Sequence, residues 1–391
     1  MDWKKTRLQT RALHAGEPRP RIGGSLSIPI FQSVVFEHLT EDTAYDDILY
    51  PRLNNLPNHV ALGRKLAALE GGEAGLVTAS GMAAITTTLL ETLGAGGHLL
   101  VQDQLYGGTH AFLVESLSSF GLSFDFVDAG DPRSWADKLR PTTRAFYVES
   151  MTNPLMQVAE HQAVASFARE HGLVSIIDNT FATPVNFRPL EIGFDLVVHS
   201  ATKYLNGHSD LVAGAIVGSG ERIHRIRHHL NHLGGTLDPH ACFLLNRGLK
   251  TLVLRVQRHN ENGLTLARAL AERPEVACVH YPGLEDHPHH ARAEKLFDGF
   301  GGMLSFEPAG GVAAARRIIG RLRIPTHGPS LGGVETLVTR PATTSHAGLG
   351  REERERLGIG DALIRVSVGV EAIDDLMQDF LGALADGSET P

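Results

Sequence analysis

Between residues 58 and about 220, short apolar runs alternate with segments of helical periodicity. The apolar runs are rich in β-branched residues and lack polar alternation, which is typical of strands covered on both faces. We expect such strands in HLLVQD, SFDFVD, RAFYVES, LVSIID, FDLVVHS and LVAGAIVG. Helices are expected in SGMAAITTTLLETLG, HAFLVESLSSFG and HQAVASFAREHG. The alternation predicts an α/β fold with a mostly parallel sheet wrapped by helices.

The first helix of this region is expected in NHVALGRKLAALEGG. Leu62, Leu66 and Leu69 fall on one face of such a helix, which would pack on the sheet. Asn58 is a candidate N-cap, and Gly71 is a candidate C-terminal stop.

The flanking segments predict an arm and a second domain. Residues 1–57 carry turn formers and little periodicity, so we expect an arm that packs on another part of the protein. LLNRGLKTLVLRVQRHNENGLTLARALAERP predicts one long helix ending at Pro274. Beyond it, VACVHYP, GGMLSFE, TLVTRP and LIRVSVG are typical of strands, and AIDDLMQDFLGALAD of a closing helix. With a boundary inside the long helix, the expected domains are 58–250, which holds the larger sheet, and 251–391, a smaller α/β domain.

Composition narrows the function classes. The 391 residues are 42% hydrophobic and 20% charged, as in a globular protein. The formal net charge of −8 disfavours binding to nucleic acid or to an anionic membrane, because both are negatively charged. No apolar run approaches the ~18 residues of a membrane span, and MDWKKTRLQTRALHAGE lacks the apolar core of a signal peptide. The two cysteines do not form a CxxC pair. We therefore expect a cytoplasmic protein that binds neither nucleic acid nor membrane.

Candidate chemistry collects where the expected strands end. Ligands of open α/β sheets bind beyond the carboxyl ends of the strands. The residues that follow four expected strands are Tyr106, Asn153, Asp178 and the group Ser200, Thr202 and Lys203. A further expected helix opens with Ser80, Gly81 and Met82, whose N–H groups favour an anion such as phosphate.

Lys203 stands between two apolar runs, where a bare ammonium would be costly to bury. Pyridoxal phosphate (PLP) needs an amine for a Schiff base, an acid for the pyridine nitrogen, a phosphate site and a ring to stack on. The strand ends and the helix start together offer this set, which makes PLP the candidate cofactor.

Six motifs resemble one family closely. They are ASGMAAI (79–85), LYGGT (105–109), IDNTF (177–181), HSATKYLNGHSD (199–210), SLGGVETL (330–337) and RVSVGVE (365–371). In order and spacing they are similar to the Cys/Met metabolism (transsulfuration) family of PLP-dependent enzymes, of cystathionine γ-synthase, cystathionine γ-lyase and methionine γ-lyase type. The resemblance covers nearly the whole chain. It implies fold-type I, the aspartate aminotransferase-like architecture with a large PLP-binding domain and a smaller C-terminal domain.

The resemblance also assigns roles to residues. It implies that Lys203 carries the cofactor as an imine and acts as the catalytic base, that Asp178 contacts the pyridine nitrogen, and that Tyr106 stacks on the ring and assists proton transfer. It implies that Arg365 binds the substrate α-carboxylate, where a planar guanidinium suits bidentate pairing. The remaining implied contacts are Gly81, Met82, Ser200 and Thr202 to the phosphate, and Asn153 and Ser330 to the cofactor oxygen and the substrate.

Members of this family borrow a tyrosine and an arginine from the neighbouring subunit for the phosphate. YPRLNN supplies Tyr50 and Arg52, and these lie in the segment expected to form an arm. The resemblance therefore implies a homo-oligomer in which subunits share active sites, with a dimer as the minimal unit and a tetramer as the family norm.

Three positions depart from the family pattern. Leu56 is inserted in the loop after Tyr50 and Arg52, Pro329 replaces the glutamate usual in enzymes that handle cystathionine, and Ala111 replaces their arginine. Because two polar anchors for a long substrate are missing, the departures favour a smaller or less charged leaving group.

The predicted function is a carbon–sulfur lyase that acts by γ-elimination on an amino acid resembling methionine or cystathionine, giving 2-oxobutanoate, ammonia and a thiol. A γ-replacement synthase of cystathionine γ-synthase or O-acylhomoserine sulfhydrylase type would use the same residues. A PLP-binding regulator is disfavoured because no catalytic residue is missing, and a nucleotide-binding oxidoreductase because no GxGxxG follows a strand. His228 and His232 are four apart but lack an acidic or cysteine partner, so no metal site is expected.

Overall fold

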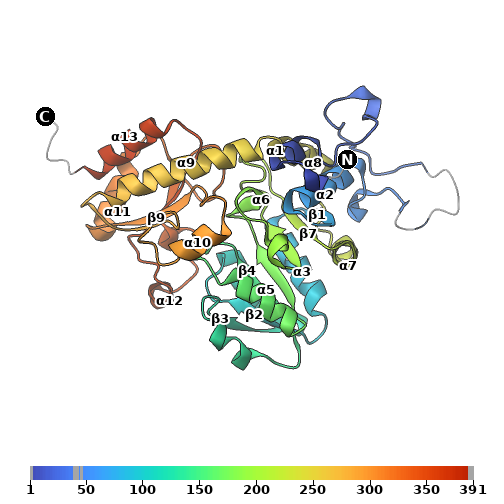
Figure 1. Cartoon of the computed structure of the whole chain (residues 1–391), viewed down its shortest axis with the longest axis horizontal. Helices are drawn as coiled ribbons and strands as arrows, with labels where there is room; N and C mark the ends of the chain where they lie inside the picture. The colour runs from blue at the N-terminus through green and yellow to red at the C-terminus, as the bar shows by residue number, and fades with distance from the viewer. Residues whose placement is uncertain (1–2, 38–43, 45–46, 386–391) are drawn as a thin grey trace. The chain divides into compact units, whose positions relative to one another are not determined.

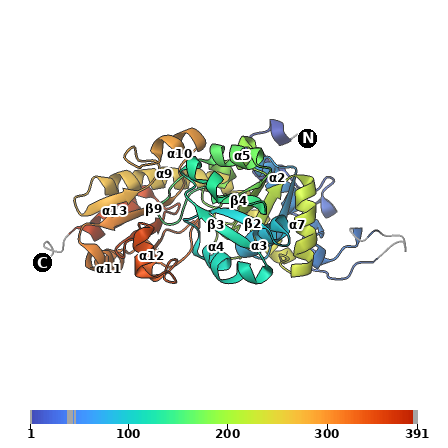
Figure 2. The same cartoon turned by 90° about the horizontal axis from the view of Figure 1, so that it is seen from below.

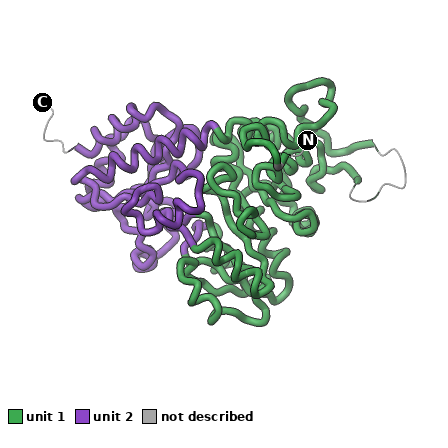
Figure 3. Tube along the Cα trace, viewed as in Figure 1, with its two compact units in different colours: residues 1–103, 108–150, 160–253 green, residues 104–107, 151–159, 254–391 purple. Residues whose placement is uncertain are grey.

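The computed structural model describes residues 3–37, 44 and 47–385. The chain forms two compact units (Figure 3): the first comprises residues 1–103, 108–150 and 160–253, and the second residues 104–107, 151–159 and 254–391. Compactness alone does not define a folding domain, so the arm over 1–57 and the domains over 58–250 and 251–391 remain predictions.

A seven-stranded sheet forms the centre of the first unit, in the order β1-β7-β6-β5-β4-β2-β3 (Figure 1). Only β7 runs antiparallel to its neighbours β1 and β6, so the predicted mostly parallel sheet is confirmed. The strands are β1 (Ala74–Thr78), β2 (His98–Gln102), β3 (Ser123–Val127), β4 (Thr143–Glu149), β5 (Val174–Asp178), β6 (Leu196–His199) and β7 (Gly214–Gly218). The predicted strand list lacks β1, whose five residues AGLVT are too short to stand out beside the preceding helix.

Helices cover both faces of this sheet. Figure 2 shows α3 (Gly81–Leu93) and α5 (His161–Glu170) on opposite sides of β2 to β4. The other helices before residue 250 are α1 (Leu8–His14), α2 (Pro57–Glu70), α4 (Gly107–Ala111), α6 (Thr183–Asn186), α7 (Gly220–Leu233) and α8 (Pro239–Leu249). The helix expected in HAFLVESLSSFG is irregular, because α4 passes into a π-helical turn over 112–116 and a 3-10 turn over 117–120.

Helix α2 ends as predicted but begins differently. Gly71 caps its C-terminus with a left-handed φ of 78°. Asn58 is not the N-cap: the helix starts at Pro57, and Leu56 occupies the cap position. The Asn58 side chain instead accepts the N–H of Phe31 at 2.9 Å and donates to the carbonyl of Pro29 at 2.9 Å, so it fastens the preceding segment.

The long helix expected up to Pro274 is two helices. Helix α8 ends at Leu249, and α9 (Leu252–Ala271) begins after a gap of two residues. The N–H and hydroxyl of Thr251 both donate to the carbonyl of Gly248, which closes a turn between the helices. The prediction of one helix was wrong because the apolar spacing continues across the break between α8 and α9.

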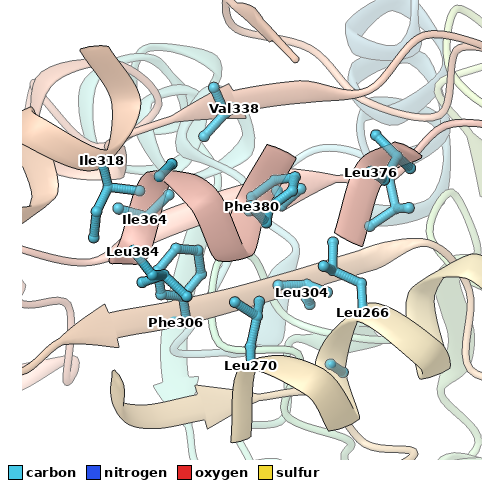
Figure 4. Packing of buried hydrophobic residues seen from close by; sticks show 14 of the residues in the cluster. Leu266, Leu270, Leu304, Phe306, Ile318, Val338, Ile364, Leu376, Phe380 and Leu384 are labelled. Atoms are coloured by element: carbon cyan, nitrogen blue, oxygen red, sulfur yellow. The ribbon is translucent and has the colours of Figure 1, made fainter. Parts of the chain in front are cut away.

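The second unit is a smaller five-stranded sheet in the order β10-β11-β12-β9-β8 with helices packed on it. The four expected strands are present as β8 (Val276–His280), β9 (Met303–Pro308), β11 (Leu337–Thr339) and β12 (Ile364–Ser367); a two-residue strand, β10 (Thr326–His327), was not expected. The remaining helices are α10 (His290–Leu296), α11 (Gly311–Arg321), α12 (Arg351–Arg356) and α13 (Ile373–Leu384). Figure 4 shows the core of this unit, where Phe380 and Leu376 of α13 pack with Leu304 and Phe306 of β9.

Within the described ranges, none of the helices has both the length and the apolar character needed to cross a bilayer.

Candidate cofactor and substrate sites

Asp178 is the last residue of β5, and its carboxylate is buried among donors. The N–H and hydroxyl of Thr180 donate to Oδ1 at 2.9 and 2.5 Å, and the Tyr147 hydroxyl lies 3.5 Å from Oδ2. Burial raises the pKa of Asp178 above its ordinary value, while the Thr180 hydrogen bonds and the charge of His199 act in the opposite direction. A cation beside this carboxylate would offset the cost of its burial, which is what a protonated pyridine nitrogen provides.

Lys203 lies in a turn that follows β6 and is held through its backbone. Its N–H donates to the carbonyl of Ser200 at 3.1 Å, and its own carbonyl accepts the N–H of Gly207 at 2.8 Å. Thr202 pairs with Ala213 in both directions, its N–H donating at 3.1 Å and its hydroxyl accepting at 3.0 Å. These contacts fix the backbone of Lys203, whose side chain is half-buried. The amine therefore extends from a rigid turn.

Thr180 links the lysine turn to the carboxylate. Its hydroxyl accepts the N–H of Ser200 at 2.8 Å while donating to Asp178. The sequence contained this residue within IDNTF, but no role was predicted for it or for Tyr147. A hydroxyl two residues after a strand-end aspartate is the signal that could have indicated Thr180, since it can form a local turn with that carboxylate.

The start of α3 forms a cradle beside Ser200. Ser80 caps the helix by accepting the N–H of Ala83 at 3.0 Å. Gly81 is required here, because a Cβ at this position would lie 2.8 Å from the Cβ of Ser200. The N–H groups of Gly81 and Met82 belong to the first turn, where a helix supplies no acceptor of its own and its dipole favours an anion.

The first unit therefore brings together an amine, a buried carboxylate, two hydroxyl side chains and a helix N-terminus. Gly81 lets Ser200 approach the start of α3 more closely than a Cβ would allow, so the Ser200 hydroxyl and the N–H groups of the helix can serve one anion. The buried carboxylate of Asp178 suits a protonated ring nitrogen. The donor set thus fits PLP.

A second cluster, within the second unit, centres on Arg365 of β12. Arg365 is 3% exposed; its Nη1 donates to Asn153 Oδ1 at 3.1 Å and its Nη2 to the carbonyl of Ser330 at 2.9 Å. Both of these acceptors are neutral, so neither cancels the buried charge. Ser330 has a φ of 116°, a strained value for a residue other than glycine, and such strain gathers at functional sites. Three predicted substrate residues thus lie together.

The other three predicted site residues are Tyr106, Tyr50 and Arg52. Tyr106 belongs to residues 104–107 of the second unit and is 45% exposed. In the first unit, the Arg52 guanidinium lies 5.5 Å from the centroid of the Tyr50 ring and donates to the carbonyl of Asn231 at 3.0 Å. Both side chains are exposed, so a group from outside the unit can reach them.

The three residues that depart from the family pattern lie at the start of α2, just before Ser330 and at the end of α4. Leu56 is fully buried at the start of α2, and the side chain of Asn55 accepts the N–H of Tyr50 at 3.0 Å, so the loop after Arg52 closes on itself. Pro329 is exposed and immediately precedes Ser330, and Ala111 is the last residue of α4.

In the part of the chain that the structure describes, no three His, Cys, Asp or Glu side chains gather to hold a metal ion. His228 and His232 of α7 pack ring against ring, with their centroids 4.6 Å apart.

Comparisons with known proteins identify the family of this chain. Residues 9–385 match the family model described as Cys/Met metabolism PLP-dependent enzyme. The chain is 43% identical to an L-methionine gamma-lyase of Pseudomonas putida, with 96% of each chain covered. It is 41% identical to a cystathionine beta-lyase of Coxiella burnetii, covering 97% of this chain and 98% of that one.

A solved structure extends the likeness to three dimensions. The cystathionine gamma-lyase of Lactobacillus plantarum, complexed with L-serine, superposes with a TM-score of 0.91 at 37% identity, covering 97% of this chain and 98% of that one. The motifs, the fold and the lysine and carboxylate of the first unit therefore share one explanation: the chain belongs to the Cys/Met metabolism family of PLP-dependent enzymes.

Proposed function

We propose that the chain is a PLP-dependent carbon–sulfur lyase that cleaves an L-amino acid resembling methionine or cystathionine by γ-elimination. The products would be 2-oxobutanoate, ammonia and a thiol. The observation that carries this proposal is the grouping of Lys203, Asp178 and the start of α3 in one unit, in a chain 43% identical to an L-methionine gamma-lyase. Amino-acid lyases of this kind act in sulfur amino-acid metabolism.

In this proposal each residue of the first cluster has one task. Lys203 binds the cofactor covalently, Asp178 pairs with its ring nitrogen, and Gly81, Met82, Ser200 and Thr202 hold its phosphate. Bound PLP supplies an electron-accepting ring, which lowers the energy of negative charge at the substrate Cα. The Lys203 amine removes the proton from Cα and returns it later, work that its rigid turn favours by fixing where the amine can reach.

The second cluster would orient the substrate. Arg365 binds the α-carboxylate, because its planar guanidinium suits bidentate pairing and is held in place by Asn153 and Ser330. Asn153 and Ser330 hold the guanidinium in a fixed plane and thereby set the direction of the Cα–H bond. Tyr106 stacks on the cofactor ring and assists proton transfer.

The working enzyme in this proposal is a cytoplasmic homotetramer built from dimers with shared active sites. Tyr50 and Arg52 would act on the phosphate of the neighbouring subunit, which their exposure in the first unit permits. Arg52→Ala should then weaken PLP binding in the oligomer, and mixing R52A with K203A subunits should restore part of the activity.

Lys203→Ala tests the core of the proposal. The purified wild type should show a visible absorbance that borohydride abolishes, and K203A should lack both this absorbance and turnover. A K203A protein that keeps both would overturn the assignment.

A substrate panel tests the reaction. Methionine, cystathionine, homocysteine, cysteine, canavanine and O-acylhomoserines would be supplied with and without a thiol, and the products identified. Release of 2-oxobutanoate supports γ-elimination, pyruvate from cystathionine would instead show β-elimination, and a new amino acid formed only with thiol would show a γ-replacement synthase. The exposed Pro329 and small Ala111 favour methionine over cystathionine in this panel.

A further inference from the structure

A buried acid–imidazole pair is formed by Glu70 and by His199, which directly precedes Ser200 of the candidate cofactor site. Glu70 is the last residue of α2, and His199 is the last residue of β6. Glu70 Oε1 lies 2.6 Å from His199 Nε2 and accepts the side-chain N–H of Asn179 at 3.1 Å. Both Glu70 and His199 have side chains that are 1% exposed. Residues from three separate segments thus meet at one carboxylate.

This pair is poorly suited to stabilise the fold. A carboxylate at the C-terminal end of a helix faces the negative end of the helix dipole, and burial adds a further cost. Within the described residues, Glu70 Oε2 and His199 Nδ1 are buried and have no hydrogen-bond partner. A half-satisfied buried pair is generally less favourable than apolar side chains of the same volume. Its presence therefore calls for a reason other than stability.

The partners of Glu70 are the immediate neighbours of the site residues. Asn179 directly follows Asp178, and His199 directly precedes Ser200 in the segment that leads to Lys203. The Asn179 N–H also donates to the carbonyl of Val198 at 2.9 Å, which continues the β5–β6 pairing. One carboxylate thereby fastens the two strand ends from which Asp178 and Lys203 extend.

The pair also contributes to the charge around Asp178. The ionisable groups near this carboxylate include Tyr147 of β4 and His199 of β6. Glu149 is the register partner of Asp178 on β4, and Glu70 pairs with the imidazole at His199 Nε2. Tyr147 and Glu149 add no positive charge at neutral pH, whereas His199 lowers the pKa of Asp178. Against the effect of burial, His199 and the hydrogen bond from Tyr147 both act to lower the pKa of Asp178.

We propose that Glu70 and His199 form a positioning pair that sets the ends of β5 and β6 and keeps Asp178 ready for a cationic ring nitrogen. The inference rests on the proposed function, since it concerns the residue that would hold the PLP ring. Neither side chain touches the cofactor in this view; both act through Asp178 and Ser200.

The test separates positioning from stability by removing both partners at once. Glu70→Leu and His199→Phe would each leave one buried group without its partner, so both single variants should lose stability. The double variant E70L/H199F leaves neither charge behind, and its melting temperature should return to within a few degrees of the wild type. E70Q and H199Q, which keep a hydrogen bond between the two positions, serve as conservative variants.

The deciding readout is the dissociation constant of PLP, measured by absorbance or fluorescence titration of each protein. If the pair positions Asp178, the dissociation constant of PLP should be at least about tenfold higher for E70L/H199F than for the wild type. A tenfold change corresponds to a shift of one unit in the pKa of Asp178. The positioning role also predicts a fall in kcat at saturating PLP with KM unchanged, because Arg365 is untouched, and near-native PLP binding in E70Q and H199Q.

A double variant that regains stability and also binds PLP like the wild type would overturn the inference and show a purely structural pair. E70M/H199L repeats the comparison if the first double variant does not fold. Failure of the proposed function is recognised separately, because the wild type itself would then bind no PLP. Lys65→Met in the other buried ion pair of α2 is the matched control, expected to lose stability without a change in PLP binding.

Discussion

Helix α2 carries two buried ion pairs, and they differ in how completely their polar atoms are satisfied. Near its middle, the Lys65 amine donates to Glu17 Oε1 at 3.2 Å and to the carbonyls of Ala12 and Leu13 at 2.9 and 3.5 Å. At its end, Glu70 meets His199, and both residues keep a buried atom without a hydrogen bond within the described residues. Both pairs are nearly inaccessible to water.

The first pair is the centre of a wider cluster. Glu17 also accepts Arg21 at 2.8 Å and Asn246 at 3.3 Å, and the Lys250 amine lies 3.7 Å away. This cluster joins the segment after α1 to α2 and α8, and it contains none of the predicted cofactor contacts. In the first pair the charged atoms of Lys65 and Glu17 all have partners, so we expect this pair to serve stability. In the second pair both residues keep atoms that no described residue satisfies, next to the candidate site, so this pair is the better candidate for a role in function.

Glu17→Leu should have the largest effect on stability. The substitution leaves Lys65 buried without its carboxylate, which costs about 3–5 kcal/mol when a buried pair loses one partner. Urea unfolding followed by circular dichroism would measure the loss. PLP binding by the folded protein should stay at the wild-type value, and a weakened affinity would erase the distinction between the two pairs.

Lys65→Met should cost less, about 1–3 kcal/mol, because it removes one donor while Glu17 retains Arg21 and Asn246. The same unfolding experiment gives the value. A loss as large as that of Glu17→Leu would mean that Arg21 and Asn246 do not compensate the carboxylate.

Lys65 also predicts a pH dependence. Burial lowers its pKa from the ordinary 10.5 to about 8, although the charge of Glu17 acts in the opposite direction. Between these values the unfolded chain holds a proton that the folded chain has released, so stability rises with pH in this window. The free energy of unfolding of the wild type, relative to K65M, should therefore increase by about 1 kcal/mol from pH 8 to 9. A flat or falling difference would contradict the lowered pKa.

How well the sequence predicted a feature depends on how far apart in the chain its interacting residues lie. The sequence predicted correctly that Asp178 ends one strand and that Ser200 and Lys203 follow another, because strand ends and turns are set by short local segments. Asn58 was misassigned as a cap because its actual partners, Pro29 and Phe31, lie in a segment without periodicity. The break between α8 and α9 was missed because Thr251 stops the helix by a local turn that apolar spacing does not reveal.

Partners far apart in the chain were beyond sequence reasoning. Glu70 and His199 are 129 positions apart, and Glu17 and Asn246 are 229 apart. No periodicity connects such pairs, and only the fold determines which buried acid meets which base. Thr180 is intermediate: it stood inside a quoted motif, but its link from Asp178 to Ser200 needed the position of the neighbouring strand.

Gly71→Ala should have the smallest effect and sharpens the comparison at the end of α2. Gly71 has a left-handed φ of 78°, and a Cβ there would come no nearer than 3.7 Å to Glu191, so the expected cost is conformational, about 1 kcal/mol. The substitution leaves the Glu70 side chain and both of its partners in place. PLP affinity should thus be unchanged in G71A although stability falls, measured by titration and urea unfolding on the same preparation. If G71A weakened PLP binding as much as the loss of Glu70, then any disturbance of this helix end would suffice, and the hydrogen bonds of Glu70 would have no special role.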